Sequence, residues 1–215
     1  MNRNESDAAP SCLHVRALQC RRGERTLFRS VDFSLDRGEI VWLRGANGQG
    51  KTTLLRTLAG LSAAETGSMT WCDAAARLSS FLYLAHANAL KEDLTATESL
   101  QFLMRVAGDE PTPDELEAAL ARFGMAGRRH APVRTLSQGQ RRRVALARLA
   151  TPRTPATWLL DEPFDALDTA GIEILNGVLV EHAKRGGSIV MTSHVPLSIA
   201  DPLPIVVMLE SPIAA

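Results

Sequence analysis

The sequence has no excess of charge, few cysteines and no long apolar run. Lys plus Arg and Asp plus Glu both number 24 in 215 residues, so no net field draws the chain to nucleic acid or acidic lipid. Cys12, Cys20 and Cys72 are scattered without a C-x-x-C pair, which leaves a disulfide framework, a zinc site and covalent haem without support. No window approaches the roughly 20 apolar residues that cross a bilayer. We therefore expect a chain of a reducing cytosol that binds no nucleic acid and does not itself span a membrane.

Short apolar runs alternate with helical patterns along the chain, of which 45% is apolar. This alternation is typical of βαβ units and predicts an α/β fold around a mainly parallel sheet. The expected strands are 13–17, 31–35, 40–43, 81–84, 158–160, 188–192 and 205–209. Three helical segments then follow one another without a strand, and they predict an all-helical insert: 97–107, 113–123 and 137–150. The polar residues 1–11 are expected to form a disordered, unprocessed tail.

A glycine-rich loop follows the apolar strand 40–43 and precedes a helical run. Residues 45–52 match the pattern G-x-x-x-x-G-K-[ST]. Glycines let successive backbone N–H groups point at phosphate oxygens, and the helix adds its positive end. Lys51 is then expected to bridge the outer phosphates and Thr52 to bind Mg²⁺, whereas the alternative is a glycine-rich turn without a ligand. The expected nucleotide contacts are Gly45, Ala46, Asn47, Gly48, Gln49, Gly50, Lys51, Thr52 and Thr53.

Two carboxylates stand at the end of the apolar strand 158–160. Ligands of open α/β sheets lie just past the carboxyl ends of the strands, which is the position of Asp161 and Glu162. Asp161 is suited to hold Mg²⁺ through water, and Glu162 to act as a general base or to orient the water that attacks the γ-phosphate. In the alternative, Asp161 caps a turn and Glu162 is solvated. The phosphate loop upstream favours the catalytic interpretation.

The third helical segment opens with the sequence Leu-Ser-Gln-Gly-Gln at 136–140. Ser137 before a helix is an ordinary cap, yet a hydroxyl and the close backbone N–H groups around Gly139 also form an anion site. Three arginines follow at 141–143. Because consecutive helical residues point about 100° apart, we expect the arginines to form a solvated or salt-bridged face rather than a ligand site.

Taken in order, these motifs resemble those of the ATP-binding subunits of ATP-binding-cassette (ABC) transporters. The resemblance spans about 13–209 and adds a D-loop at 166–168 and a switch histidine, His194. It implies an ABC-type P-loop NTPase core with an N-terminal antiparallel β part and a helical signature subdomain. The implied organisation is one ATP-binding domain over 12–215, with the core in 12–88 and 152–215 and the helical subdomain in 89–151.

The resemblance also implies how such a chain acts. Two copies stack head to tail, and each ATP with its Mg²⁺ lies between the phosphate loop of one copy and the signature residues Ser137, Gly139 and Gln140 of the other. His194 is then implied to contact the γ-phosphate and to hold Glu162 and the attacking water, although a lone histidine after a strand is usually only a polar loop residue.

The sequence departs from the family pattern in two places. His86 stands where most cassettes carry a glutamine that touches Mg²⁺ and the membrane partner, and a neutral imidazole can replace one amide contact. The aromatic residue that usually stacks on adenine is missing from 19–23, which leaves an arginine face as the alternative support for the base.

The segments 83–100, 136–149 and 160–168 resemble the cassettes of c-type cytochrome biogenesis. They imply a peripheral ATPase at the cytoplasmic face of the bacterial inner membrane, bound to a permease subunit and energising haem export or the release of haem from a carrier. Haem is then expected to bind to the partner subunits, so that this chain acts on it only indirectly. The alternatives are the ATPase of another exporter or importer, and a soluble non-transport ABC protein of the DNA-repair or translation-factor kind.

Overall fold

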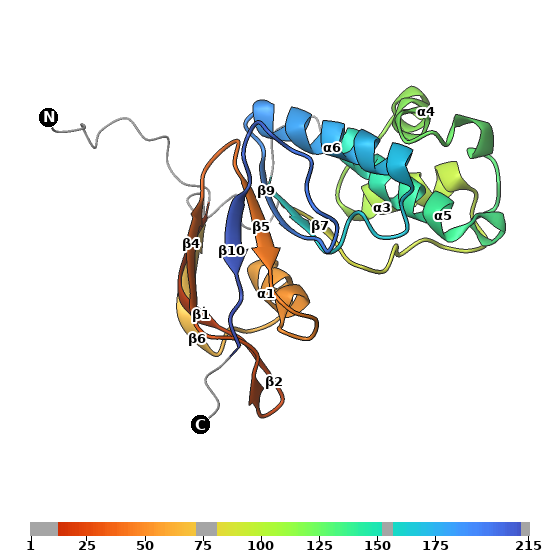
Figure 1. Cartoon of the computed structure of the whole chain (residues 1–215). Helices are drawn as coiled ribbons and strands as arrows, with labels where there is room; N and C mark the ends of the chain where they lie inside the picture. The colour runs from red at the N-terminus through yellow and green to blue at the C-terminus, as the bar shows by residue number, and fades with distance from the viewer. Residues whose placement is uncertain (1–12, 72–80, 152–156, 212–215) are drawn as a thin grey trace, which may run out of the picture. The chain divides into compact units, whose positions relative to one another are not determined.

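A computed structural model describes residues 13–71, 81–151 and 157–211 (Figure 1). The expected tail, Cys12 and Cys72 lie outside these residues. The chain divides into two compact units. Unit 1 comprises Met1–Tyr83, Pro155–Asp161 and His182–Ala215, and unit 2 comprises Leu84–Thr154 and Glu162–Glu181.

A five-stranded sheet forms the centre of unit 1, in the order β10-β5-β9-β8-β7. The pairs β10 with β5, β5 with β9 and β8 with β9 are parallel. Every residue of β8 and β9 is buried, which explains the apolar runs 158–160 and 189–191 within them. The strands are β5 (Ile40–Arg44), β7 (Phe81–Leu84), β8 (Thr157–Leu160), β9 (Ser188–Thr192) and β10 (Ile205–Met208), of which Leu84 belongs to unit 2.

Unit 1 also contains a three-stranded antiparallel sheet in the order β4-β1-β6 and a two-stranded hairpin of β2 and β3. β6 is a strand that the sequence did not predict, because its apolar alternation is limited to Met69 and Trp71. A Cβ on Gly67 would overlap the carbonyl of Ala17, where the ladder between β1 and β6 is irregular. The elements are β1 (Leu13–Gln19), β4 (Val31–Leu35), β6 (Thr66–Trp71), β2 (Arg21–Arg22) and β3 (Arg25–Thr26).

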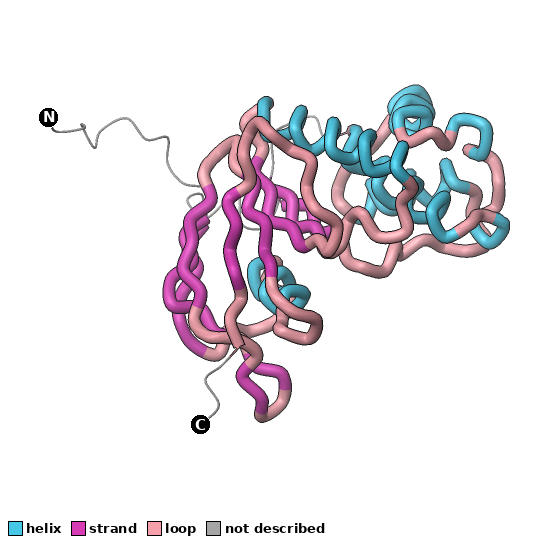
Figure 2. Tube along the Cα trace, viewed as in Figure 1, coloured by secondary structure: helices cyan, strands magenta, loops and turns pink. Residues whose placement is uncertain are grey.

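The core of unit 1 forms around α1 (Lys51–Leu58), which Figure 2 shows among the strands of that unit. Leu54, Leu55 and Leu58 of α1 are buried in one cluster with apolar residues of both sheets. Burial of this face fixes the start of α1 at the end of β5. The cluster includes Leu13, Val15, Phe28, Val41, Leu43, Leu159 and Val190.

Unit 2 holds most of the helices, drawn in cyan in Figure 2. They are α3 (Ala96–Val106), α4 (Pro113–Arg122), α5 (Gln138–Ala147) and α6 (Thr169–Lys184), of which α6 extends into unit 1. Short 3₁₀ turns follow at Ala126–Arg128, Val133–Thr135 and Arg148–Ala150.

Capping boxes fix the starts of three of these helices. The N-cap hydroxyls of Thr95, Thr112 and Ser137 each accept a hydrogen bond from the backbone N–H three residues later, and the side chain there returns one. The three predicted helices are thereby confirmed, whereas α6 was not predicted as a helix. Among the described residues, no helix combines the length and the apolar character needed to span a membrane.

Candidate functional site

The phosphate loop lies between β5 and α1. Gly48 and Gly50 have φ of 77° and 93°, in the left-handed region that favours glycine. A Cβ on Gly50 would also lie 2.9 Å from the Cβ of Leu27. The Nζ of Lys51 donates to the carbonyls of Gly45 at 2.8 Å and Ala46 at 3.2 Å. The loop therefore curls around the ammonium group, and the binding of phosphate by Lys51 stays a prediction.

The side chain of Gln49 connects the start of the loop to Ser211. Its Oε1 accepts a hydrogen bond from the backbone N–H of Ala46, and its Nε2 donates to the hydroxyl of Ser211 at 2.9 Å. Ala46, Asn47 and Gly48 are exposed at the tip of the loop. The backbone at the tip of the loop is thus accessible, while Gln49 holds Ala46 by a hydrogen bond.

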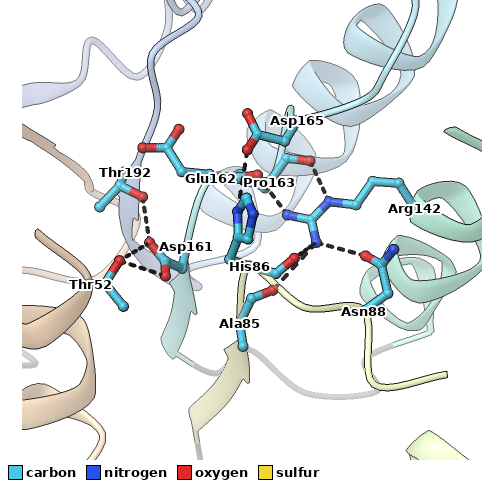
Figure 3. Close-up of polar contacts among 10 residues, drawn as sticks. All are labelled: Thr52, Ala85, His86, Asn88, Arg142, Asp161, Glu162, Pro163, Asp165 and Thr192. Carbon is cyan, nitrogen blue, oxygen red and sulfur yellow. Dashed lines mark hydrogen bonds and ion pairs between the residues drawn. The ribbon is translucent and has the colours of Figure 1, made fainter. Parts of the chain in front are cut away.

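Asp161 is buried at the end of β8 and accepts hydrogen bonds from two threonines (Figure 3). The Oγ1 of Thr52 lies 2.9 Å from Oδ2 and 3.1 Å from Oδ1, and the Oγ1 of Thr192 donates to Oδ1 at 3.0 Å. Hydroxyl and carboxylate oxygens are hard donors of the kind that Mg²⁺ takes when it also binds substrate phosphates. The donor set therefore fits a magnesium ion held by Thr52 and Asp161 together with a nucleotide.

Thr192 is the member of this cluster that sequence reasoning missed. β9 lies beside β8 in parallel, with Met191 opposite Leu160, so Thr192 and Asp161 leave neighbouring strands at the same edge. The available signal was a hydroxyl directly after a buried apolar run.

A cavity of about 370 Å³ adjoins the loop in unit 1. Lys51 and His194 both line it, and His194 is exposed there. The structure therefore brings together Lys51 and the predicted switch histidine, which the sequence places 143 residues apart. Other lining residues are Trp42, Arg44, Gly45, Ala46, Gln49 and Ser193.

Glu162 opens the second segment of unit 2 and is buried, with φ of 47°. In the same unit the Nδ1 of His86 lies 3.3 Å from the Oδ2 of Asp165, and both side chains are substantially exposed. His86 is thus paired with a carboxylate, and its predicted role toward Mg²⁺ stays a prediction.

A second cavity, of about 430 Å³, lies at the start of α5 in unit 2. It is lined by Ser137, Gly139 and Gln140 of the signature together with Ala166 and Asp168. A Cβ on Gly139 would lie 2.8 Å from the carbonyl oxygen of Ala166, so the close approach of the two segments requires glycine. The signature and the D-loop therefore share one cavity.

The side chain of Asp168 is fixed at this cavity. Its carboxylate accepts a hydrogen bond from the backbone N–H of Gly171 at 2.9 Å and a charge-assisted one from Arg143. The hydrogen bond from Gly171 has the larger effect and that from Arg143 the next, and together they hold the pKa of Asp168 below its ordinary value.

The arginines of α5 correct one expectation. Arg141 pairs with Glu92 and Arg143 with Asp168, as a salt-bridged face predicts. Arg142 is instead only 2% exposed and donates to backbone carbonyls. The prediction of a solvated face was wrong for Arg142, because the side chain is buried within unit 2.

Comparisons with known proteins agree with this geometry. Residues 28–165 match the family described as ABC transporter. A cytochrome c biogenesis ATP-binding export protein CcmA of Nitrosomonas europaea is 45% identical over 188 residues, covering 85% of this chain and 88% of the relative. CcmA 2 of Cupriavidus metallidurans is 46% identical over 86% of this chain and 90% of the relative. CcmA of Escherichia coli O157:H7 is 44% identical over 88% and 92%.

Solved structures give the same fold. An ABC transporter ATP-binding protein from Pyrococcus furiosus superimposes with a TM-score of 0.81 at 22% identity, over 93% of this chain and 99% of that one. An ATP-binding subunit of an ABC transporter gives 0.76 at 25% identity, over 93% and 86%. The expected α/β fold of the ABC ATPase type is confirmed. The chain belongs to the ABC transporter family of ATP-binding proteins, within the group of the cytochrome c biogenesis ATP-binding export proteins.

Proposed function

We propose that this chain is the ATP-hydrolysing subunit of an ABC transporter complex for c-type cytochrome biogenesis, which energises haem export or the release of haem from its carrier. As a member of its family the chain binds ATP. The relatives that share 44–46% of its residues are named for ATP-binding export in cytochrome c biogenesis, which supports the cellular role. The ATPase activity is inferred above all from one observation: the Lys51 loop and the Thr52–Asp161 pair lie at one edge of the sheet.

The phosphate loop is proposed to hold the nucleotide. Phosphate oxygens would replace the carbonyls of Gly45 and Ala46 as acceptors of the Lys51 ammonium, and the backbone N–H groups of the loop and of Thr53 would bind the rest. Thr52 and Asp161 are the proposed holders of Mg²⁺, which when bound neutralises charge on the outer phosphates.

The hydrolytic step is assigned to Glu162 and His194. Glu162 would accept a proton from the water that attacks the γ-phosphate, and His194 would donate a hydrogen bond to the γ-phosphate. The exposure of His194 on the cavity that Lys51 lines supports this assignment.

A second copy of the chain is proposed to complete each ATP site. The start of α5 presents Ser137, Gly139 and Gln140 at a cavity of its own, and a helix N-terminus favours an anion. The anion that this cavity would take is the γ-phosphate of ATP bound to the other copy. One domain would thus contribute to two ATP sites.

The membrane partner is proposed to be the permease subunit of the cytochrome c maturation system, at the cytoplasmic face of the inner membrane. His86 is the proposed link between the ATP site and this permease. With its Nδ1 beside Asp165, the nitrogen left to approach Mg²⁺ or its water is Nε2. The haem itself would be bound by partner subunits.

The test is purification of the chain from membranes with its partners, followed by their identification and by assays of ATP hydrolysis. Recovery of cytochrome c maturation subunits with an ATPase activity is the expected result. Recovery of a different permease would assign the chain to another exporter or importer, and the absence of ATP hydrolysis in the intact complex would reject the enzyme.

A further inference from the structure

Arg142 is a buried cation in the middle of α5 that contacts two separate loops (Figure 3). A guanidinium group presents five N–H donors in a rigid plane, so one side chain can fix several acceptors at once. The five acceptors described below, in Ala85, His86, Asn88, Glu162 and Pro163, belong to unit 2. Its position is therefore defined within one compact body.

The first loop follows β7. Nη1 of Arg142 donates to the Oδ1 of Asn88 at 2.9 Å and lies 3.3 Å and 3.4 Å from the carbonyl oxygens of His86 and Ala85. The same nitrogen thus holds the backbone on which the His86 side chain is carried.

The second loop follows β8 and begins with the proposed general base. Nη2 of Arg142 donates to the carbonyl of Glu162 at 2.6 Å, and Nε donates to the carbonyl of Pro163 at 3.3 Å. The φ of Glu162 is 47°, a left-handed conformation that is unfavourable for a residue with a Cβ and persists where surrounding contacts hold it. A charge-assisted bond to the carbonyl of this same residue is such a contact.

We propose that Arg142 is a positioning residue for ATP hydrolysis: it holds the Glu162 backbone, and through it the direction of the Glu162 carboxylate, in register with the 85–88 loop and the signature helix. This inference rests on the proposed function, since it assumes that Glu162 is the base. α5 begins directly after Ser137 and carries Arg142. If the helix shifts when its start binds a phosphate, Arg142 therefore transmits the shift to Glu162. Arg142 touches no reacting atom in this account.

The central experiment compares Arg142→Met with the wild-type full chain, purified with its membrane subunits. Methionine keeps an apolar side chain of similar length and removes every donor. We expect kcat for ATP hydrolysis to fall by about tenfold to a hundredfold, the range that a misplaced catalytic group costs, while the Kd for ATP changes less than about twofold. Arg142→Lys should recover part of kcat, because it restores one donor but not the planar guanidinium group.

The control is Arg122→Met, which removes an exposed arginine of unit 2 that pairs with Glu181. This variant should leave both kcat and the Kd for ATP unchanged.

A double-variant cycle separates positioning from a general loss of structure. If Arg142 acts through Glu162, then adding Arg142→Met to Glu162→Gln should lower the residual rate by less than about twofold, because the group that it positions is already inactive. Multiplication of the two separate losses would overturn the proposal.

Asn88→Ala keeps the proposal testable if Arg142→Met does not fold. It removes one acceptor at the half-exposed 85–88 loop and leaves the arginine in place, and it should lower kcat by a smaller factor at unchanged ATP affinity. Wild-type kcat in both Asn88→Ala and Arg142→Lys would overturn the inference. The proposed function would survive that outcome as long as the wild type hydrolyses ATP and Glu162→Gln does not.

Discussion

The hydroxyl of Thr192 donates a hydrogen bond of 3.0 Å to the carboxylate of Asp161 from the neighbouring strand of the sheet. Both residues are buried, and Thr52 approaches the same carboxylate from α1. The orientation of Asp161 therefore depends on two strands and one helix.

Thr192→Val should weaken this arrangement without changing the volume of the side chain. A hydrogen bond to a charged group contributes about 2 kcal/mol, so the free energy of unfolding should fall by that order. The Mg²⁺ concentration for half-maximal hydrolysis should rise, because Asp161 is held less firmly. Urea unfolding and a Mg²⁺ titration of the ATPase measure the two effects. Thr192→Ser is the control that retains the hydroxyl, and identical titrations of the valine and serine variants would remove Thr192 from the site.

Lys51→Ala and Glu162→Gln should separate binding from turnover. Loss of the Lys51 ammonium leaves phosphate charge uncompensated, so this variant should lose ATP affinity. Glu162→Gln should bind ATP and hydrolyse it at least about a hundredfold more slowly, because an amide cannot accept the proton. Equilibrium binding of a labelled nucleotide and steady-state hydrolysis check both. Turnover at the wild-type rate in Glu162→Gln would exclude this carboxylate as the base.

Arg143→Met should raise the pKa of Asp168 toward its ordinary value. The hydrogen bond from Gly171 would remain and that from Arg143 would be lost. A carboxyl group with a lowered pKa stabilises the fold above its ordinary pKa, and this contribution disappears as the pH falls through the lowered value. The stability difference between wild type and Arg143→Met should therefore shrink on acidification to the pH range in which Asp168 is protonated in both. NMR titration of the Asp168 carboxyl carbon measures the shift directly, and an unchanged pKa would show that Arg143 does not act on it.

Gly187→Ala should destabilise unit 1. The added Cβ would overlap the imidazole of His182, which is buried and stacked on Trp158 with ring centroids 3.5 Å apart and planes 8° apart. Overpacking of this kind costs about 2 kcal/mol, which thermal or urea unfolding detects. Gly177→Ala is the matched control, because its Cβ would meet nothing within 4 Å inside α6 and alanine is the better helix former. Equal stability of the two alanine variants would contradict the packing argument.

Local signals explain which parts of the molecule could be predicted from the sequence. Buried parallel strands such as β8 and β9 carry apolar runs, and the starts of α4 and α5 carry their capping boxes in the sequence. β6 pairs through its backbone with β1 while its side chains stay largely exposed, so periodicity gave no signal. Asp168 caps the start of α6, because its carboxylate accepts a hydrogen bond from the backbone N–H of Gly171. The sequence analysis did not use this aspartate as a cap signal, and α6 was missed.

The same distinction holds at the candidate site. Lys51, Asp161 and the signature residues belong to motifs with fixed spacing, and the structure places them at the ends of the expected elements. Thr192 and Arg142 take their positions from contacts across the fold. A row of three arginines looks alike in sequence, and only packing decides that Arg142 turns inward while Arg141 and Arg143 form ion pairs. The single-domain organisation over 12–215 stays a prediction.

In the proposed function each ATP site is built from two copies, of which one provides the Lys51 loop and the other the Ser137 end of α5. Ser137→Arg should retain ATP binding and lose hydrolysis, because the added side chain fills the cavity that is meant for the other copy's γ-phosphate. Lys51→Ala should also be inactive, because its own phosphate loop no longer binds ATP. The most direct test is to mix these two inactive variants and measure ATP hydrolysis, since a mixed pair contains one site with both an intact Lys51 and an intact Ser137. We expect the mixture to hydrolyse ATP well above the mean rate of the two variants measured alone. A mixture no more active than that mean would rule out an ATP site shared by two copies.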